Sequence, residues 1–259
     1  MALSDIKCFL LDMDGTFYLG DRAIDGSLEF IDKVRATGRD YLFLTNNSSH
    51  NAQFYVERLR RMGLDTDRRH ILTSGEATCA ILNARFPGKR CFVLGNEYLV
   101  EEFREAKIPV DAERPEVVVA GFDTTLDYDK LWRACDLVRA GLPFVATHPD
   151  FNCPTETGFM PDIGAILAFI EASTGRRPDM VVGKPNPGIV DAALRRTGLT
   201  ADKLAMVGDR LYTDIETGLQ NGMLSILVMS GETTEAMLAA SKTIPDLKFG
   251  RLSDMIPLL

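Results

Sequence analysis

The amino-acid sequence predicts an α/β fold, in which parallel sheets are covered by helices and a smaller α/β domain is inserted into a larger one. Short apolar runs alternate with longer amphipathic stretches along the whole chain. This alternation is typical of β–α units, whose parallel strands are joined by helices. Two stretches, Ile71–Gly75 and Gly175–Pro178, look like the junctions of the inserted domain.

Each short apolar run is expected to be a strand, and each amphipathic stretch a helix. The expected strands are Lys7–Leu11, Tyr41–Leu44, Cys91–Leu94, Val117–Ala120, Phe144–Ala146, Met180–Val182, Leu204–Val207 and Ser225–Met229. The expected helices include Ser27–Ala36, Ala52–Met62, Glu76–Ala84, Tyr98–Glu105, Tyr128–Ala140, Ile163–Ser173, Pro187–Arg195 and Tyr212–Gln220.

The 259 residues suffice for one large or two smaller domains. We expect a discontinuous core domain made of residues 1–76 and 178–259, and an inserted domain made of residues 77–177. The segment between the two junctions has enough strands and helices of its own to fold as an α/β unit.

Composition excludes several classes of protein. The formal net charge of −8 argues against a nucleic-acid partner, because phosphate backbones call for a basic face. The five cysteines are scattered, which favours reduced thiols over disulfides. No apolar run is long enough for a membrane helix, and the first residues lack the pattern of a signal peptide. We therefore expect a cytoplasmic protein without a membrane partner.

The strongest chemical signal is the pair Asp12 and Asp14, which follows the apolar run Lys7–Leu11 and leads into Gly15. On an extended chain residues two apart point the same way, so a strand end can aim both carboxylates at one spot. Like charges so close favour a bound cation or a retained proton. A turn or helix cap would explain these residues equally well.

Two further clusters follow expected strands. Thr45–Ser49 offers hydroxyl, amide and backbone N–H groups at a helix start, where an oxyanion could bind. Lys184 lies in Val182–Pro187, just ahead of a helix capped by Asn186. Considered alone, the first cluster is adequately explained as an N-cap and the second as a solvated lysine.

The fourth cluster, Gly208–Asp214, places Asp209 at a strand end and Asp214 about one helical turn later. Hard oxygen ligands near a turn suit Mg²⁺, which takes one or two carboxylates and keeps several waters. In an open α/β sheet, ligands bind beyond the carboxyl ends of the strands, so the four clusters can converge. Together they provide the groups that phosphoryl transfer needs.

These clusters resemble, in order along the chain, motifs I to IV of the haloacid dehalogenase (HAD) superfamily: Asp12–Thr16, Thr45, Lys184 and Gly208–Asp214. The residues of Thr45–Ser49, Val182–Pro187 and Gly208–Asp214 are similar to those of the NagD-like branch, which includes 4-nitrophenylphosphatases and phosphoglycolate and pyridoxal-phosphate phosphatases. The resemblance spans the chain and implies a Rossmann-like parallel-sheet core with an inserted α/β cap of the C2 type.

The resemblance implies a Mg²⁺-dependent phosphatase of small phosphorylated metabolites that works through an aspartyl-phosphate. Asp12 would be the nucleophile and Asp14 the general acid and base. The metal would be held by Asp12, Asp209 and the backbone carbonyl of Asp14. Asp214, the remaining member of the metal group, would orient Lys184 or a metal-bound water.

The same resemblance assigns the substrate contacts. Thr45 and Lys184, with backbone amides near Gly15, would hold the phosphoryl oxygens. Asn46 and Asn47 are also expected to bind substrate.

Two residues of the insertion depart from the family pattern. His148, in Ala146–Asp150, stands where relatives usually have asparagine, and Asp162, in Thr157–Ala165, replaces a commoner small residue. Both are candidate substrate-binding residues that would set specificity. A solvated or hydrogen-bonded loop histidine is an equally good interpretation of His148.

Several alternatives stay open at this point. Dehalogenases lack the second acidic residue of motif I, so Asp14 argues against that activity. A phosphotransferase or phosphomutase with the same aspartyl-phosphate, and a non-catalytic phosphometabolite-binding protein, are the rival functions. Sugar phosphates, nucleoside monophosphates, phosphoglycolate and pyridoxal phosphate are the candidate substrates, and a homodimer through the cap is the expected assembly if the chain associates.

Overall fold

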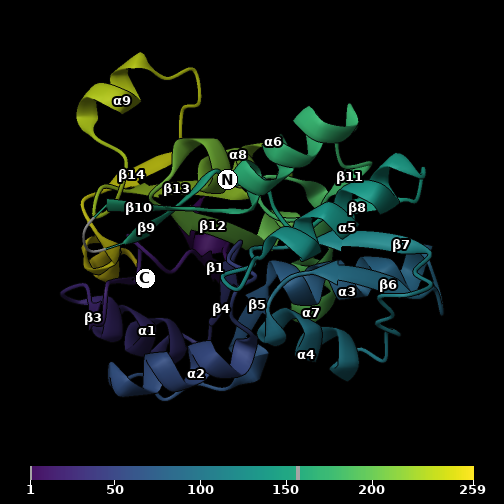
Figure 1. Cartoon of the computed structure of the whole chain (residues 1–259). Helices are drawn as coiled ribbons and strands as arrows, with labels where there is room; N and C mark the ends of the chain where they lie inside the picture. The colour runs from purple at the N-terminus through teal and green to yellow at the C-terminus, as the bar shows by residue number, and fades with distance from the viewer. Residues whose placement is uncertain (1, 156–157) are drawn as a thin grey trace. The chain divides into compact units, whose positions relative to one another are not determined.

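The computed structural model describes residues 2–155 and 158–259, and the chain divides into two compact units (Figure 1). The first unit comprises Met1–Thr45, Gln53–Leu72 and Val190–Leu259, and the second comprises Asn46–Ala52 and Thr73–Ile189. The domain boundaries expected from the sequence stay a prediction. Thr157, the first residue of the stretch Thr157–Ala165, lies outside the described residues.

A six-stranded sheet in the order β14-β13-β12-β1-β4-β5 organises the first unit. β1 pairs in parallel with β12 on one side and with β4 on the other, and β13 pairs in parallel with β12 and β14. All residues of β1, β12 and β13 are buried, as expected for strands covered on both faces. The strands are β1 Cys8–Leu11, β4 Asp40–Thr45, β5 Ile71–Thr73, β12 Leu204–Gly208, β13 Leu224–Val228 and β14 Leu247–Phe249.

Helices cover this sheet, with α1 and α2 on one side and α8 on the other (Figure 1). α1 turns Phe30, Ile31 and Val34 inward, and the Phe30 ring packs edge-on against Phe9 of β1 at 5.5 Å between centroids. The helices are α1 Ser27–Ala36, α2 Ala52–Arg61, α7 Pro187–Thr197, α8 Glu216–Gln220 and α9 Glu235–Ala240. A short hairpin, β2 Tyr18–Leu19 with β3 Arg22–Ala23, follows β1.

The second unit has its own parallel sheet, in the order β11-β8-β7-β6, and a separate antiparallel hairpin of β9 with β10. Buried residues of β6, β7, α5 and α6 form one apolar cluster that includes Phe92, Val118, Leu131 and Ile166. The elements are α3 Ser74–Arg85, β6 Cys91–Leu94, α4 Glu97–Glu105, β7 Val117–Ala120, α5 Tyr128–Arg139, β8 Phe144–Ala146, β9 Asn152–Thr155, β10 Gly158–Pro161, α6 Ile163–Thr174 and β11 Met180–Val181.

The predicted fold class is confirmed: a parallel-sheet α/β core with further sheets that form a cap. All eight expected strands form, with ends that differ by at most one residue. The expected helix Tyr212–Gln220 is wrong at its start, because Leu211–Ile215 forms a π-helical turn before α8. The hairpin strands β9 and β10 were not predicted because most of their residues are exposed. The edge strand β14 was not predicted because its three residues alternate between partly buried and exposed.

None of the described helices is long and apolar enough to span a membrane.

The central position of β1 gives a prediction for stability. Leu10 is fully buried in this strand, so Leu10→Ala should destabilise the first unit by about 2–5 kcal/mol through lost apolar burial and a residual cavity. Ile244→Ala is the control, because this side chain is 72% exposed and its truncation removes little packing. Urea unfolding of the two variants measures the difference, and equal midpoints would contradict the prediction.

Candidate active site

Two aspartates leave neighbouring strands at the same edge of the first sheet. Leu11 is paired with Val207, and the Asp12 N–H donates to the Val207 carbonyl at 2.9 Å, so β1 and β12 end together. Asp12 follows β1, and Asp209 follows Gly208 at the end of β12. Carboxylate oxygens of Asp12, Asp209 and Asp214 all lie within 4.8 Å of one another.

The Asp209 side chain is fixed from two sides. One carboxylate oxygen accepts the Glu232 N–H at 2.6 Å and the other accepts the Thr16 hydroxyl at 3.4 Å. Gly15 has a φ of +81°, and a Cβ at this position would overlap the Asp209 carboxylate. Glycine is therefore required here both for the backbone conformation and for the close approach.

Asp214 is brought back to the strand end by the π-helical turn. Its side chain is completely buried, and one carboxylate oxygen accepts the Arg210 backbone N–H at 3.1 Å. A Cβ on Gly208 would overlap the Asp214 carboxyl group, so the last residue of β12 must be glycine for this packing.

The three carboxylates of Asp12, Asp209 and Asp214 together have the donor chemistry of a divalent-cation site. Burial raises the pKa of Asp209, and the negative charges of Asp12 and Asp214 raise it further. Burial alone would lower the pKa of Arg210, but the negative charges of the same carboxylates outweigh this effect and hold the pKa above its ordinary range. Three oxygen ligands with mutual repulsion fit a hard cation such as Mg²⁺.

Asp14 has a different environment from its neighbour in the motif. Burial is the main reason that the pKa of Asp14 is raised to about 6. The positive charge of Arg58 partly offsets this rise, and the negative charge of Asp12 adds to it. The Tyr18 hydroxyl donates to the Asp14 carboxylate at 3.2 Å, and the Arg58 guanidinium lies 4.4 Å from the centre of the Tyr18 ring. Tyr18 and Arg58 were not predicted from the sequence, although Tyr18 lies only four residues beyond Asp14.

Thr45 is the last residue of β4, which lies on the other side of β1 from β12. It is buried, and the next residue along the chain, Asn46, begins the second unit. Thr45, Asp12 and Asp209 thus follow or end three consecutive strands of one sheet, β4, β1 and β12.

Lys184 and Asn46 are brought together in the second unit, 138 residues apart in sequence. Lys184 is 2% exposed and lies just after β11. The Asn46 side-chain oxygen accepts the Lys184 N–H at 2.7 Å, and its amide nitrogen donates to the Lys184 carbonyl at 3.0 Å. Asn46 therefore fixes the backbone of Lys184, and its amide also donates to Asp150 at 3.2 Å.

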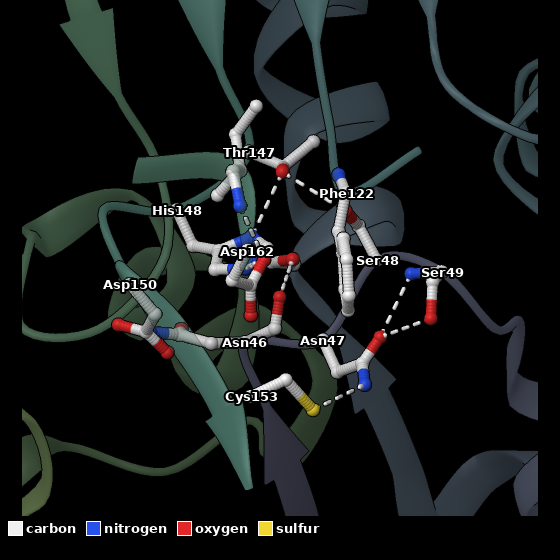
Figure 2. Close-up of polar contacts among 12 residues, drawn as sticks. Asn46, Asn47, Ser48, Ser49, Phe122, Thr147, His148, Asp150, Cys153 and Asp162 are labelled. Atoms are coloured by element: carbon white, nitrogen blue, oxygen red, sulfur yellow. Dashed lines mark hydrogen bonds and ion pairs between the residues drawn. The ribbon is translucent and has the colours of Figure 1, made fainter. Parts of the chain in front are cut away.

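The other candidate substrate-binding residues have partners within the second unit (Figure 2). The Asn47 side-chain oxygen accepts the Ser49 N–H at 2.8 Å and the Ser49 hydroxyl at 2.7 Å. His148 and Asp162 are buried and bonded to each other, with 3.0 Å between His148 Nε2 and Asp162 Oδ1. The catalytic, metal-binding and substrate-binding roles assigned from the sequence stay predictions.

Comparison with known proteins places this geometry in a family. Residues 9–109 match a family model described as haloacid dehalogenase-like hydrolase, and residues 181–255 match a second, HAD-hydrolase-like model. The acid sugar phosphatase of Staphylococcus aureus (strain MRSA252) is 36% identical over 255 residues, which cover 98% of each chain.

The solved structures agree. The crystal structure of 4-nitrophenylphosphatase from Thermotoga maritima superposes with a TM-score of 0.96 at 47% identity over 98% of both chains. NagD from E. coli K-12 superposes with a TM-score of 0.89 at 32% identity, over 96% of this chain and 98% of NagD.

The chain belongs to the haloacid dehalogenase-like hydrolases. Its similarity to NagD and 4-nitrophenylphosphatase confirms the predicted branch of the HAD superfamily. The predicted enzyme class, a HAD-type phosphoric monoester hydrolase, is confirmed by the same relatives. HAD hydrolases generally use a divalent metal, and the Asp12, Asp209 and Asp214 carboxylates form a group that could hold one.

This acidic group of the HAD hydrolase predicts cation-dependent stability. Millimolar Mg²⁺ should stabilise the folded wild-type chain and so raise its melting temperature. The stabilisation should reach about 2.7 kcal/mol at a Mg²⁺ concentration one hundred times the Kd. Asp209→Asn should abolish most of the rise, because it removes one buried ligand and part of the repulsion that a cation relieves. Thermal unfolding in EDTA and in Mg²⁺ measures both effects.

Asp32→Asn is the matched control, because Asp32 is exposed on α1 and should leave the Mg²⁺ response unchanged. An equal response of both variants, or no response of the wild type, would refute the cation site.

Proposed function

We propose that this HAD hydrolase is a Mg²⁺-dependent phosphatase of small phosphorylated metabolites, sugar phosphates among them, and that it works through an aspartyl-phosphate. The observation that carries the proposal is the carboxylate group of Asp12, Asp209 and Asp214 beside Asp14, a carboxyl whose pKa is raised to about 6. The acid sugar phosphatase and 4-nitrophenylphosphatase relatives support this substrate class.

In the first step the Asp12 carboxylate attacks phosphorus, and the bond from phosphorus to the ester oxygen breaks. Asp14 gives its proton to the departing oxygen, so the product leaves as an alcohol. The raised pKa of Asp14, caused first by burial, suits a group that must hold a proton near neutral pH.

In the second step a water molecule attacks the phosphorus of the aspartyl-phosphate, and Asp14 takes the proton of that water. The acyl phosphate bond breaks, phosphate leaves and the Asp12 carboxylate is restored. The hydrogen bond from Tyr18 holds the Asp14 carboxylate in place for both transfers.

Mg²⁺ held by Asp12, Asp209 and the Asp14 carbonyl, with Asp214 beside it, would neutralise charge on the phosphoryl group. Thr45 and the backbone amides near Gly15 would bind phosphoryl oxygens. Lys184 completes this set in the proposal, and its support is the motif order together with the Asn46 contacts that fix its backbone.

Substitution of the two aspartates of motif I tests the mechanism. Asp12→Asn should reduce turnover of 4-nitrophenyl phosphate with Mg²⁺ to background, because the amide is not a competent nucleophile. Asp14→Asn should lower kcat by about 10²–10⁴-fold, the usual contribution of acid–base catalysis. Release of 4-nitrophenolate and of inorganic phosphate measures both effects.

Mass spectrometry of quenched Asp14→Asn should also show a chain heavier by one phosphoryl group, because the intermediate then hydrolyses slowly. Wild-type rates in either variant would overturn the assigned roles. Transfer of the phosphoryl group to an added alcohol in preference to water would favour the phosphotransferase alternative, and binding of sugar phosphates without phosphate release would favour a non-catalytic protein.

The Tyr18 contact gives a further prediction. Tyr18→Phe keeps the buried ring but removes the hydroxyl that donates to Asp14, so kcat should fall by up to about tenfold, the size of one hydrogen bond. Tyr128→Phe is the control, because this tyrosine is 73% exposed on α5. Steady-state kinetics with 4-nitrophenyl phosphate compare the two, and identical kcat values would show that Tyr18 does not position Asp14.

Among the sequence-based expectations, the homodimer through the cap and the cytoplasmic location stay predictions.

A further inference from the structure

His148 and Asp162 stand at the two ends of the segment that joins β8 to α6 and contains the β9–β10 hairpin. In sequence they are two separate departures from the usual residues of the family. In the structure they are bonded to each other, with 3.0 Å between Nε2 and Oδ1, and their side chains are 0% and 4% exposed (Figure 2). The two departures are therefore parts of one arrangement.

The hydrogen bonds of Asp162 decide which nitrogen of His148 carries the proton. An ionised carboxylate can only accept, and Asp162 Oδ1 already accepts the Ile163 N–H at 2.5 Å, which caps α6. With Asp162 as the acceptor, His148 Nε2 is the donor of the shared hydrogen bond.

The other face of the ring supports the same tautomer. His148 Nδ1 lies 2.9 Å from the Thr147 hydroxyl, which lies 3.0 Å from the Ser48 hydroxyl, and Ser48 accepts the Phe122 N–H at 2.9 Å. With Nδ1 as acceptor, Thr147 donates to the ring and Ser48 donates to Thr147, so each hydroxyl gives and accepts one bond. The reverse direction would leave the Ser48 hydrogen without an acceptor among the described residues.

A cation site is the alternative for this cluster, because His148, Asp150 and Asp162 lie within 4.8 Å of one another. Both ring nitrogens of His148 already have hydrogen-bond partners, which accounts for their positions without a cation. We therefore assign a hydrogen-bonded pair.

The pair is connected to Lys184 through two short steps. Asp150, two residues after His148, accepts from the Asn46 amide, and Asn46 bonds both backbone groups of Lys184. Gly183 lies directly against the pair, because a Cβ there would come within 2.6 Å of both His148 Cβ and Asn46 Oδ1. A shift of the His148 backbone would therefore displace Gly183 and, with it, the backbone of Lys184.

Backbone hydrogen bonds next to the pair join the two ends of the β9–β10 hairpin. The Asp162 N–H donates to the Phe151 carbonyl at 2.9 Å, and the Gly164 N–H donates to the Asp150 carbonyl at 2.8 Å. Phe151 and Phe159 are 61% and 72% exposed.

We propose that His148 and Asp162 form a buried positioning pair that holds the chain on either side of the β9–β10 hairpin, and through Asp150 and Asn46 the Lys184 backbone, in the conformation that binds the phosphorylated substrate. This inference rests on the proposed phosphatase function. In this proposal the two buried side chains act through the residues that they hold, rather than through the direct substrate contact that the sequence predicts.

Two substitutions of one residue test the pair. His148→Asn keeps a polar group near Nδ1 but loses the donor at the position of Nε2, whereas His148→Gln keeps a donor near that position. His148→Asn should raise the KM for 4-nitrophenyl phosphate and for sugar phosphates by about tenfold or more, since small displacements of binding groups are costly. His148→Gln, the matched control, should stay within a few-fold of wild type.

The variant Asp162→Ala and the double variant with His148→Asn and Asp162→Ala complete a double-mutant cycle. Because the pair acts as a unit, His148→Asn should add little to the effect of Asp162→Ala. A merely structural role would lower the amount of folded enzyme and leave the KM unchanged. Equal effects of His148→Asn and His148→Gln, or a wild-type KM in both, would overturn the inference.

An NMR measurement on the wild-type chain tests the pair without any substitution of His148 or Asp162. With three histidines in the chain, His50→Gln and His70→Gln assign the His148 ring. Its ¹⁵N signals should show a protonated Nε2 and an unprotonated Nδ1, and the opposite tautomer would refute the pair. Absence of wild-type turnover would overturn the phosphatase proposal and this inference together, whereas active wild type with an unchanged His148→Asn would overturn only the pair.

Discussion

The parallel pairing of β1 with β12 is the constraint on which the candidate active site depends. It joins residues nearly 200 positions apart and ends both strands at one edge, where Asp12 and Asp209 leave the sheet. Gly15 and Gly208 then let Asp209 and Asp214 pack without a Cβ in the way. The result is three repelling carboxylates in a largely buried place, an arrangement that is costly unless a cation binds.

Much of the fold was predictable because its strands are fully buried. Val117–Ala120 and Leu204–Gly208 read as continuous apolar runs for this reason, and their order along the chain indicates parallel pairing. The hairpin strands β9 and β10 are exposed on both faces, so their formation depends on tertiary contacts that leave no periodic pattern. The π-helical turn at Leu211–Ile215 has helical spacing, and sequence alone cannot distinguish it from an α-helix.

The candidate site likewise has features that the sequence predicts and features that it does not. Strand ends of a parallel sheet must meet at one edge, so the grouping of Asp12, Asp209 and Asp214 followed from the sequence. The environment of Asp14 did not follow, because Tyr18 reaches it from a hairpin of two-residue strands. The link between His148 and Asp162 was equally hidden, since residue types indicate the capacity for hydrogen bonds but not their partners.

The proposed chemistry assigns different electrostatic tasks to its side chains. Asp12 and Asp14 attack and exchange protons but repel a phosphate, whereas Lys184, whose backbone is fixed by Asn46, would attract the phosphoryl group. A residue that perturbs Asp14 should therefore act on the chemical step, since Asp14 carries the proton. A residue that perturbs the Lys184 backbone should act on the binding of the phosphoryl group, in both the ground and the transition state. The Tyr18 hydroxyl and the His148–Asp162 pair support different steps for this reason: the first bonds Asp14 directly, and the second acts on the Lys184 backbone through Asp150 and Asn46.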